Sequence, residues 1–148
     1  MGLDQTIMTK YAVIRIYDDG RRVEHELHDS IKQSNHHLAL TEYVKKLIKR
    51  GISNFNCDHI SADFCNRSLD LKRGNKKLDL IYHDGTKFIE CELKTEGETG
   101  LNRTYEQLEQ MSQHCQNLVL LVPRHKIEFC REMLKNRNIN RVTIDTYQ

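Results

Sequence analysis

The feature that most constrains the fold is a pair of strand-like runs joined by a tight turn. The runs are KLDLIYH at residues 77–83 and TKFIECELK at residues 86–94, and Asp84-Gly85 lies between them. Asp-Gly is preferred in two-residue hairpin turns, because both residues tolerate the backbone conformations that these turns require. We therefore predict an antiparallel hairpin, around which the rest of the chain must arrange its sheet.

Two carboxylates and one ammonium group share a face of the second strand. Residues i and i+2 of a strand point to the same side, so Glu90, Glu92 and Lys94 lie together and the apolar residues between them face the core. Neighbouring carboxylates repel one another unless a cation lies among them. Glu90 has two interpretations, either a third acidic contributor to this group or a surface carboxylate.

A further carboxylate lies on the first strand. Pairing about Asp84-Gly85 places residues 78–80 roughly opposite residues 89–91, so that Asp79 can reach the neighbourhood of Glu92 where the strands splay. Hard cations such as Mg²⁺ prefer one or two carboxylates together with waters and phosphate oxygens of the substrate. Asp79 and Glu92 offer that arrangement.

The rest of the chain predicts an α/β fold with a mixed sheet flanked by helices. Apolar residues at helical spacing predict a helix over 36–50 that Gly51 ends. For His36-His37 we favour a role at the helix N-terminus, or no role, over metal binding. No linker interrupts the chain, so we predict one domain over 1–148, with a hairpin extension at 1–30 and a core at 36–148. We also expect a hairpin at 11–27 with its turn at 18–20, helices near 101–115 and 127–134, a doubly buried strand at 118–122 and a last strand at 141–147.

Composition favours a chain that stays in the cytoplasm, or in the host-cell cytoplasm if the protein is viral. No run approaches the 18 apolar residues of a membrane span, and the N-terminus has no apolar signal core. The odd number of cysteines, five, suits reduced thiols better than a disulfide framework. Cys57, His59 and Cys65 could supply three zinc ligands, but their spacing fits no compact zinc template, so we favour buried thiols beside a surface histidine.

Charge is segregated along the chain, although the net formal charge is only +2. Residues 66–77 hold five basic side chains against one acidic, and residues 124–141 hold six against two. Between them, residues 90–98 hold four glutamates against one lysine. An acidic centre between basic segments suits a cation-dependent enzyme that acts on a polyanion. Taken alone, each cluster is also explained as solvated surface charge.

Asp79, followed thirteen positions later by Glu92-Leu93-Lys94 at the end of a hairpin strand, resembles the signature of the PD-(D/E)xK nuclease superfamily. The match is close to its archaeal and viral Holliday-junction-resolvase-like branch, and the following TYEQLEQMSQH helix and LVLLV strand extend it over about residues 36–122. Leu78 stands where a proline usually precedes the aspartate, and Glu42 is the candidate for a glutamate that such members carry on the first helix. The resemblance implies a restriction-endonuclease-like mixed β-sheet flanked by helices, with an extra N-terminal β-hairpin.

The resemblance also implies a chemistry, that of a Mg²⁺- or Mn²⁺-dependent deoxyribonuclease that hydrolyses phosphodiester bonds. Asp79, Glu92 and the backbone carbonyl of Leu93 would ligate the metal, which polarises the scissile phosphate and lowers the pKa of a bound water. Lys94 would orient that water or stabilise the charge that develops on the phosphorane. The candidates for supporting contacts around this site are Glu42, Glu90, Tyr105 and Gln107.

DNA is the expected partner, and its shape rather than its sequence is the expected signal. The chain has few aromatic residues and no evident reading helix, which favours recognition of phosphate geometry in branched DNA by a homodimer with one site for each strand. Two alternatives remain, a DNA-binding module of this fold without catalysis and a protein-interaction domain that uses the N-terminal hairpin as a sheet edge. The residues expected to hold the phosphate backbone are Arg67, Lys72, Arg73, Lys76, Lys77, Arg103, Arg124 and Lys126.

Overall fold

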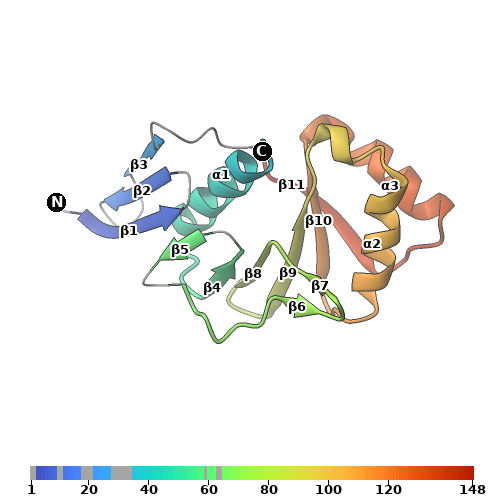
Figure 1. Cartoon of the computed structure of the whole chain (residues 1–148), viewed down its shortest axis with the longest axis horizontal. Coiled ribbons are helices and arrows are strands. Elements are labelled where there is room, and N and C mark those ends of the chain that lie inside the picture. The colour runs from blue at the N-terminus through green and yellow to red at the C-terminus, as the bar shows by residue number, and fades with distance from the viewer. Residues whose placement is uncertain (1–2, 10–11, 18–21, 28–34, 59, 63–64) are drawn as a thin grey trace.

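A computed structural model of the chain contains a five-stranded sheet, a four-stranded sheet and a short two-stranded ribbon. The structure describes residues 3–9, 12–17, 22–27, 35–58, 60–62 and 65–148 (Figure 1). The helices in this part of the chain are α1 (Asn35–Lys49), α2 (Asn102–Ser112) and α3 (Ile127–Asn136), with short 3₁₀ turns η2 (Glu96–Glu98) and η3 (Arg124–Lys126). None of them is long and apolar enough to cross a membrane, a statement that covers the described residues only.

The five-stranded sheet is mixed and has the strand order β11-β10-β9-β8-β4. Its antiparallel part pairs β4 with β8 and β8 with β9, while β9, β10 and β11 run parallel to one another. The parallel connections cross over through α2 and α3, as parallel pairing requires. The strand bounds are Phe55–Cys57 for β4, Leu80–His83 for β8, Phe88–Leu93 for β9, Leu118–Val122 for β10 and Val142–Thr146 for β11. The predicted α/β class with a mixed sheet flanked by helices is confirmed.

Helices cover both faces of this sheet. The apolar residues of α1 form one core with Leu80, Cys91 and Leu93, and those of α2 and α3 form a second core with Ile81 and Leu120. The two cores explain why β10 is an unbroken apolar run, because a strand covered on both faces has no polar side. Glu90 and Glu92, on the α2 side of β9, are buried as well, at 5% and 2% exposure.

Helix α1 confirms the predicted helix to within one residue at each end. Its buried residues Leu40, Tyr43, Val44, Leu47 and Ile48 follow the i, i+3, i+4, i+7, i+8 rule. The helix stops at Gly51, whose φ of 87° is readily adopted only by glycine. The amide of Ile52 then donates to the carbonyl of Leu47, which is the Schellman closure of a helix C-terminus.

The N-terminal strands form a second sheet with the order β3-β2-β1-β5, at the left of Figure 1. The predicted hairpin is present as β2 (Ala12–Tyr17) paired with β3 (Arg22–Leu27), while its predicted turn at 18–20 lies outside the described residues. Strand β1 (Leu3–Thr9) was not predicted, and it pairs with β5 (Ile60–Ala62). The extension is therefore tied to the chain between β4 and β8 by main-chain pairing.

The hairpin of β8 and β9 differs from the predicted register by two residues. Leu80 pairs with Cys91 and His83 with Phe88, and the amide of Asp84 donates to the carbonyl of Lys87, so the turn centres on Gly85 and Thr86 rather than on Asp84-Gly85. Continuing this register places Asp79 opposite Glu92. The position of the turn therefore sets a register in which the two carboxylates are neighbours, and the strands do not have to splay apart.

Candidate functional site

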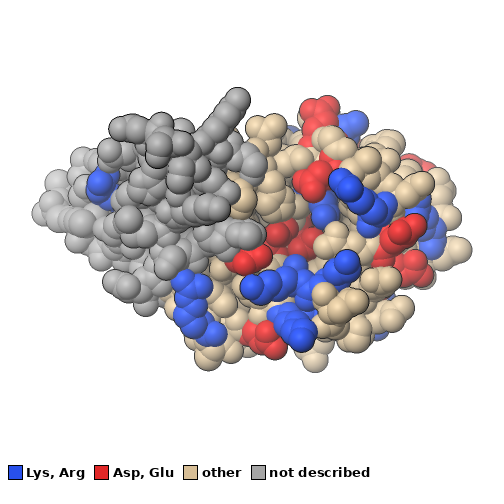
Figure 2. Space-filling view, in the orientation of Figure 1, with Lys and Arg blue, Asp and Glu red and all other residues tan. Residues whose placement is uncertain are grey.

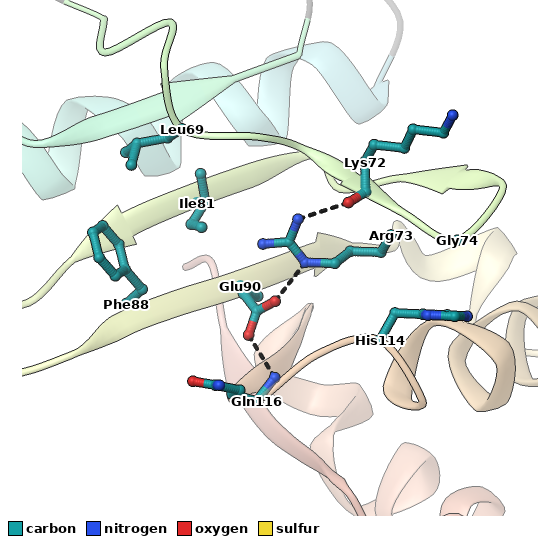
Figure 3. A pocket seen from close by; sticks show the side chains of 9 residues that line it. All are labelled: Leu69, Lys72, Arg73, Gly74, Ile81, Phe88, Glu90, His114 and Gln116. Carbon is teal, nitrogen blue, oxygen red and sulfur yellow. Dashed lines mark hydrogen bonds and ion pairs between the residues drawn. The ribbon is translucent and has the colours of Figure 1, made fainter.

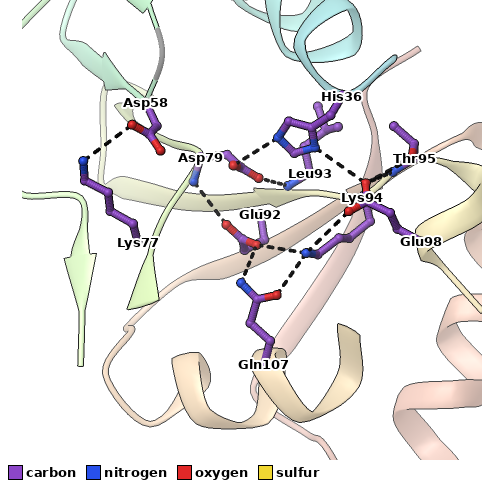
Figure 4. Close-up of polar contacts among 10 residues, drawn as sticks. All are labelled: His36, Asp58, Lys77, Asp79, Glu92, Leu93, Lys94, Thr95, Glu98 and Gln107. Carbon is purple, nitrogen blue, oxygen red and sulfur yellow. Dashed lines mark hydrogen bonds and ion pairs between the residues drawn. The ribbon is translucent and has the colours of Figure 1, made fainter. Parts of the chain in front are cut away.

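The Asp79 and Glu92 carboxylates lie side by side at the end of the hairpin, each held by a main-chain amide. Asp79 Oδ2 accepts from the Leu93 amide at 2.8 Å, and Glu92 Oε1 accepts from the Asp79 amide at 3.2 Å (Figure 4). The Asp79 side chain is 14% exposed and that of Glu92 only 3%. The Asp79 carboxylate thus replaces a main-chain acceptor for the Leu93 amide, while Glu92 shares the Asp79 amide with the carbonyl of Cys91, and these bonds fix the orientation of both side chains.

Lys94 and Gln107 close the site on the α2 side. The Lys94 ammonium donates to Gln107 Oε1 at 3.0 Å and lies 3.6 Å from Glu92 Oε2, while Gln107 Nε2 donates to Glu92 Oε2 at 3.3 Å. Burial raises the pKa of Glu92 to about 8, and the Asp79 carboxylate adds to this rise, whereas Lys94 and His36 oppose it. Gln107 is one of the supporting candidates expected from the sequence, and the structure places it in contact with both charged groups.

His36 and Glu98 complete the cluster, although neither is among the site residues expected from the sequence. The imidazole lies between two acids, with Nε2 at 3.2 Å from Asp79 Oδ1 and Nδ1 at 3.6 Å from Glu98 Oε1 (Figure 4). Hydrogen bonds to Asp79 and then to Glu98 raise the pKa of His36 to about 10, and burial opposes them. The imidazole is therefore a cation at neutral pH, although a helix N-terminus disfavours positive charge.

Two sequence signals could have found these residues. His36 precedes Leu40 by four positions, which puts it on the buried face of α1. Glu98 completes a capping box with Thr95, and its Oε1 accepts from the Thr95 amide and hydroxyl at 3.0 Å each. The His36 hydrogen bond, helped by those from Thr95, lowers the pKa of Glu98 to about 2.

Glu90 points away from the cluster, and its interpretation as a surface carboxylate is wrong because the residue is only 5% exposed. Its Oε1 accepts from the amides of Gln116 and Asn117 at 2.8 and 2.9 Å, and its Oε2 accepts from Arg73 Nε at 2.6 Å. Arg73 was expected on the phosphate backbone, but its guanidinium is engaged here. Glu90 and Arg73 thus form a buried pair that holds the loop before β10.

Two other supporting candidates lie elsewhere. The Tyr105 hydroxyl donates to the carbonyl of Thr99 at 2.5 Å and contacts Cys130, and the residue is fully buried between α2 and α3. Glu42 is 51% exposed on α1 and pairs with Lys45 at 3.0 Å. In both cases helical periodicity turns the side chain away from the Asp79–Glu92 pair, and the position near Asp79 on α1 is taken by His36.

Basic side chains border the acidic cluster on one face of the molecule. Figure 2 shows Lys and Arg gathered over the ribbon of β6 (Lys72–Arg73) and β7 (Lys76–Lys77), beside acidic residues at the centre of the view. A pocket of about 250 Å³ next to Lys94 and Gln107 is lined by Lys76 and Arg103 among others. Lys72, Lys76 and Lys77 are exposed, and Lys77 lies 3.5 Å from Asp58.

The other basic candidates are spread more widely. Arg67 is exposed. Arg124 donates to the carbonyl of the terminal Gln148 at 3.3 Å, and the Lys126 ammonium lies 4.9 Å from the ring centre of Phe129. These two residues belong to η3, which follows β10, rather than to the ribbon.

Two sets of residues are candidates for metal ligands from the sequence. Within the described residues, no group of three or more His, Cys, Asp or Glu side chains is arranged to hold a metal ion. Cys57 and Cys65 are buried free thiols, as expected, while His59 lies outside the described residues. The Asp79–Glu92 pair supplies two carboxylates, and the Leu93 side chain lies in the core on the α1 side while its main chain borders the pair.

Comparison of the chain with protein-family models, with curated proteins and with solved structures finds no match in any of the three.

Proposed function

We propose that the protein is a Mg²⁺- or Mn²⁺-dependent endonuclease that hydrolyses phosphodiester bonds in DNA. The observation that carries the proposal is the placement of the Asp79 and Glu92 carboxylates side by side, with the Lys94 ammonium next to them on the same strand. The proposal includes a restriction-endonuclease-like fold, with which the order of α1, the β8–β9 hairpin, α2 and β10 is compatible.

The donor set fits a hard divalent cation. Mg²⁺ is usually held by one or two carboxylates and completes its shell with waters and phosphate oxygens, so the buried Glu92 and the partly buried Asp79 suffice. Asp79, Glu92 and the Leu93 carbonyl would hold the ion. When bound, it would polarise the scissile phosphate and lower the pKa of a coordinated water.

Side chains of the protein position the charged groups of the site and the phosphate backbone of the DNA. Gln107 fixes the Lys94 ammonium beside Glu92, so that a positive charge stands ready where negative charge develops on the phosphate. His36 holds Asp79 from the opposite side. Lys72, Lys76 and Arg103 would hold the phosphate backbone without reading bases.

The deciding experiment is incubation of labelled DNA with the wild-type chain, with and without Mg²⁺. We expect cleavage only with the metal, loss of cleavage in Asp79→Asn and Glu92→Gln with DNA binding retained, and no loss in Glu109→Gln, which removes an exposed acid of α2. Clear residual cutting by Glu92→Gln contradicts the assignment. A metal-independent mobility shift without cleavage favours a non-catalytic DNA-binding module instead, and silence favours a protein-interaction domain.

The proposal extends to branched DNA bound by a homodimer, since two symmetric sites suit the two strands of a junction. A four-way junction should then compete better than a linear duplex of equal length, and the protein should elute as a dimer. Equal competition together with a monomeric elution volume would leave a generic nuclease.

A further inference from the structure

A second cavity lies further along the same face of β9. It has a volume of about 480 Å³ and is bounded by Leu69, Ile81 and Phe88 on one side and by Arg73, Lys72 and His114 on the other (Figure 3). Glu90 lies at its floor, and Glu92 belongs to the candidate site. Residues i and i+2 of a strand are about 6.6 Å apart, so the cavity and the site are neighbours along one strand.

The polar edge of the cavity carries the Arg73 guanidinium, a hydrogen-bond donor whose position the protein fixes. Arg73 Nε donates to Glu90 at 2.6 Å, and its Nη1 donates to the carbonyls of Asp70 and Lys72 at 2.7 Å each. Nη2 takes part in none of these three hydrogen bonds, and Figure 3 shows it pointing toward Ile81 and Phe88. The guanidinium thus presents a hydrogen-bond donor whose position is fixed before any ligand arrives.

The apolar edge offers a surface for stacking. Phe88 is 39% exposed, one of three exposed large apolar side chains among the described residues, and the centre of its ring lies 4.8 Å from that of His83 with the planes 80° apart. A wall of Leu, Ile and Phe opposite a fixed donor suits a flat group that is apolar on its faces and accepts hydrogen bonds at its edge. A nucleobase has that chemistry.

A small anion fits the cavity less well. The charge of Arg73 is already compensated by the buried Glu90 carboxylate, so the guanidinium attracts a second anion only weakly. Lys72, at the rim, is exposed and could contact the phosphate of the nucleotide whose base enters.

We propose that this cavity receives one unpaired nucleobase of the DNA strand held at the Asp79–Glu92 site. The inference rests on the proposed function for its choice of ligand. It supplies a reason for selectivity toward distorted or branched DNA, because fully paired bases stay stacked in the duplex and cannot enter.

The test is binding measured by fluorescence anisotropy in EDTA, so that no cleavage takes place. Two dye-labelled duplexes of one sequence are compared, one with a single bulged adenine and one with an abasic residue at the same position. We expect the wild type to bind the bulged base about 5- to 150-fold more tightly, the range for stacking one base on an aromatic side chain. Phe88→Ala should remove this preference, and Phe88→Tyr should keep it.

Phe129→Ala is the matched control, since Phe129 is equally exposed at 42% but lies on α3. Equal affinity of the wild type for the two duplexes, or a preference that survives in Phe88→Ala, overturns the inference. Cleavage is scored separately. If the wild type cuts DNA but shows no preference for the bulged base, only the base-pocket inference is refuted. If it shows a Phe88-dependent preference but does not cut DNA, only the nuclease proposal is refuted.

Discussion

Removal of the Glu90 carboxylate tests whether that residue stabilises the fold rather than serving the candidate site. Glu90→Ala leaves the amides of Gln116 and Asn117 and the guanidinium of Arg73 without their common acceptor. Breaking a buried ion pair by removing one partner costs about 3–5 kcal/mol. Because the adjacent cavity admits water to the guanidinium, we expect the lower end, about 3 kcal/mol, which lowers the melting temperature by roughly 6–12 °C in a domain of this size.

The assay is urea unfolding followed by circular dichroism, with Glu106→Ala, an exposed acid of α2, as the control that should change stability by less than about 0.5 kcal/mol. A double-mutant cycle with Arg73→Ala should give a coupling of about 1.5–3 kcal/mol, the scale of a hydrogen bond to a charged group. A loss below about 1 kcal/mol for Glu90→Ala, or additive losses in the cycle, would refute the reasoning.

The pH dependence gives an independent check. Burial by itself raises the pKa of Glu90, but hydrogen bonds from Asn117, Arg73 and Gln116 together lower it below its ordinary value. A carboxyl whose pKa is lowered by folding stabilises the folded state above its unfolded pKa of 4.5, and this contribution is lost as the pH falls further. The stability difference between the wild type and Glu90→Ala should therefore shrink in acid.

Three other perturbations have definite expected outcomes. Lys94→Ala should lower cleavage by about 10²-fold or more in single-turnover assays, with Lys94→Arg giving little rescue, and an affinity loss alone would make Lys94 a phosphate contact. Gly74→Ala should destabilise the fold by about 1 kcal/mol or more in urea unfolding, because φ is 63° and the new Cβ would lie 2.9 Å from the His114 ring; unchanged stability would mean that the ribbon moves freely. His36→Asn should cost most stability between about pH 4.5 and 6.5. The loss should fade as the pH rises toward 10, where His36 deprotonates, and as it falls toward 2, where Glu98 protonates; a pH-independent loss would contradict the ion pair.

The long elements of the fold were predictable because their periodicity records burial. The apolar positions of α1 and the unbroken run of β10 each report directly which faces are covered. Strands β6 and β7 have two residues each, too few for any pattern. Strand β5 has only three and pairs with β1, which lies far away in the sequence.

The register of the hairpin was not predictable from its apolar pattern. The predicted and observed registers differ by two residues, and a shift of two keeps every side chain on the same face. Leu80 and Tyr82 therefore share a face with Ile89 and Cys91 in both registers. The carboxylates of Asp79 and Glu92 could be named from the sequence, but the contacts of His36 and Glu98 with them depend on how α1 and η2 pack against β9.

The turn between β8 and β9 can change in length without changing the positions of the Asp79 and Glu92 carboxylates. Gly85 lies at the tip, where an added Cβ meets nothing within 4 Å, at the end of the hairpin opposite Asp79. Residues inserted between His83 and Phe88 would lengthen the loop while leaving the strand pairs intact, and a longer loop costs little free energy. Evolution can therefore change the interval of thirteen positions between Asp79 and Glu92 without moving either side chain. A search for distant relatives should accordingly fix the paired strands and leave that interval open.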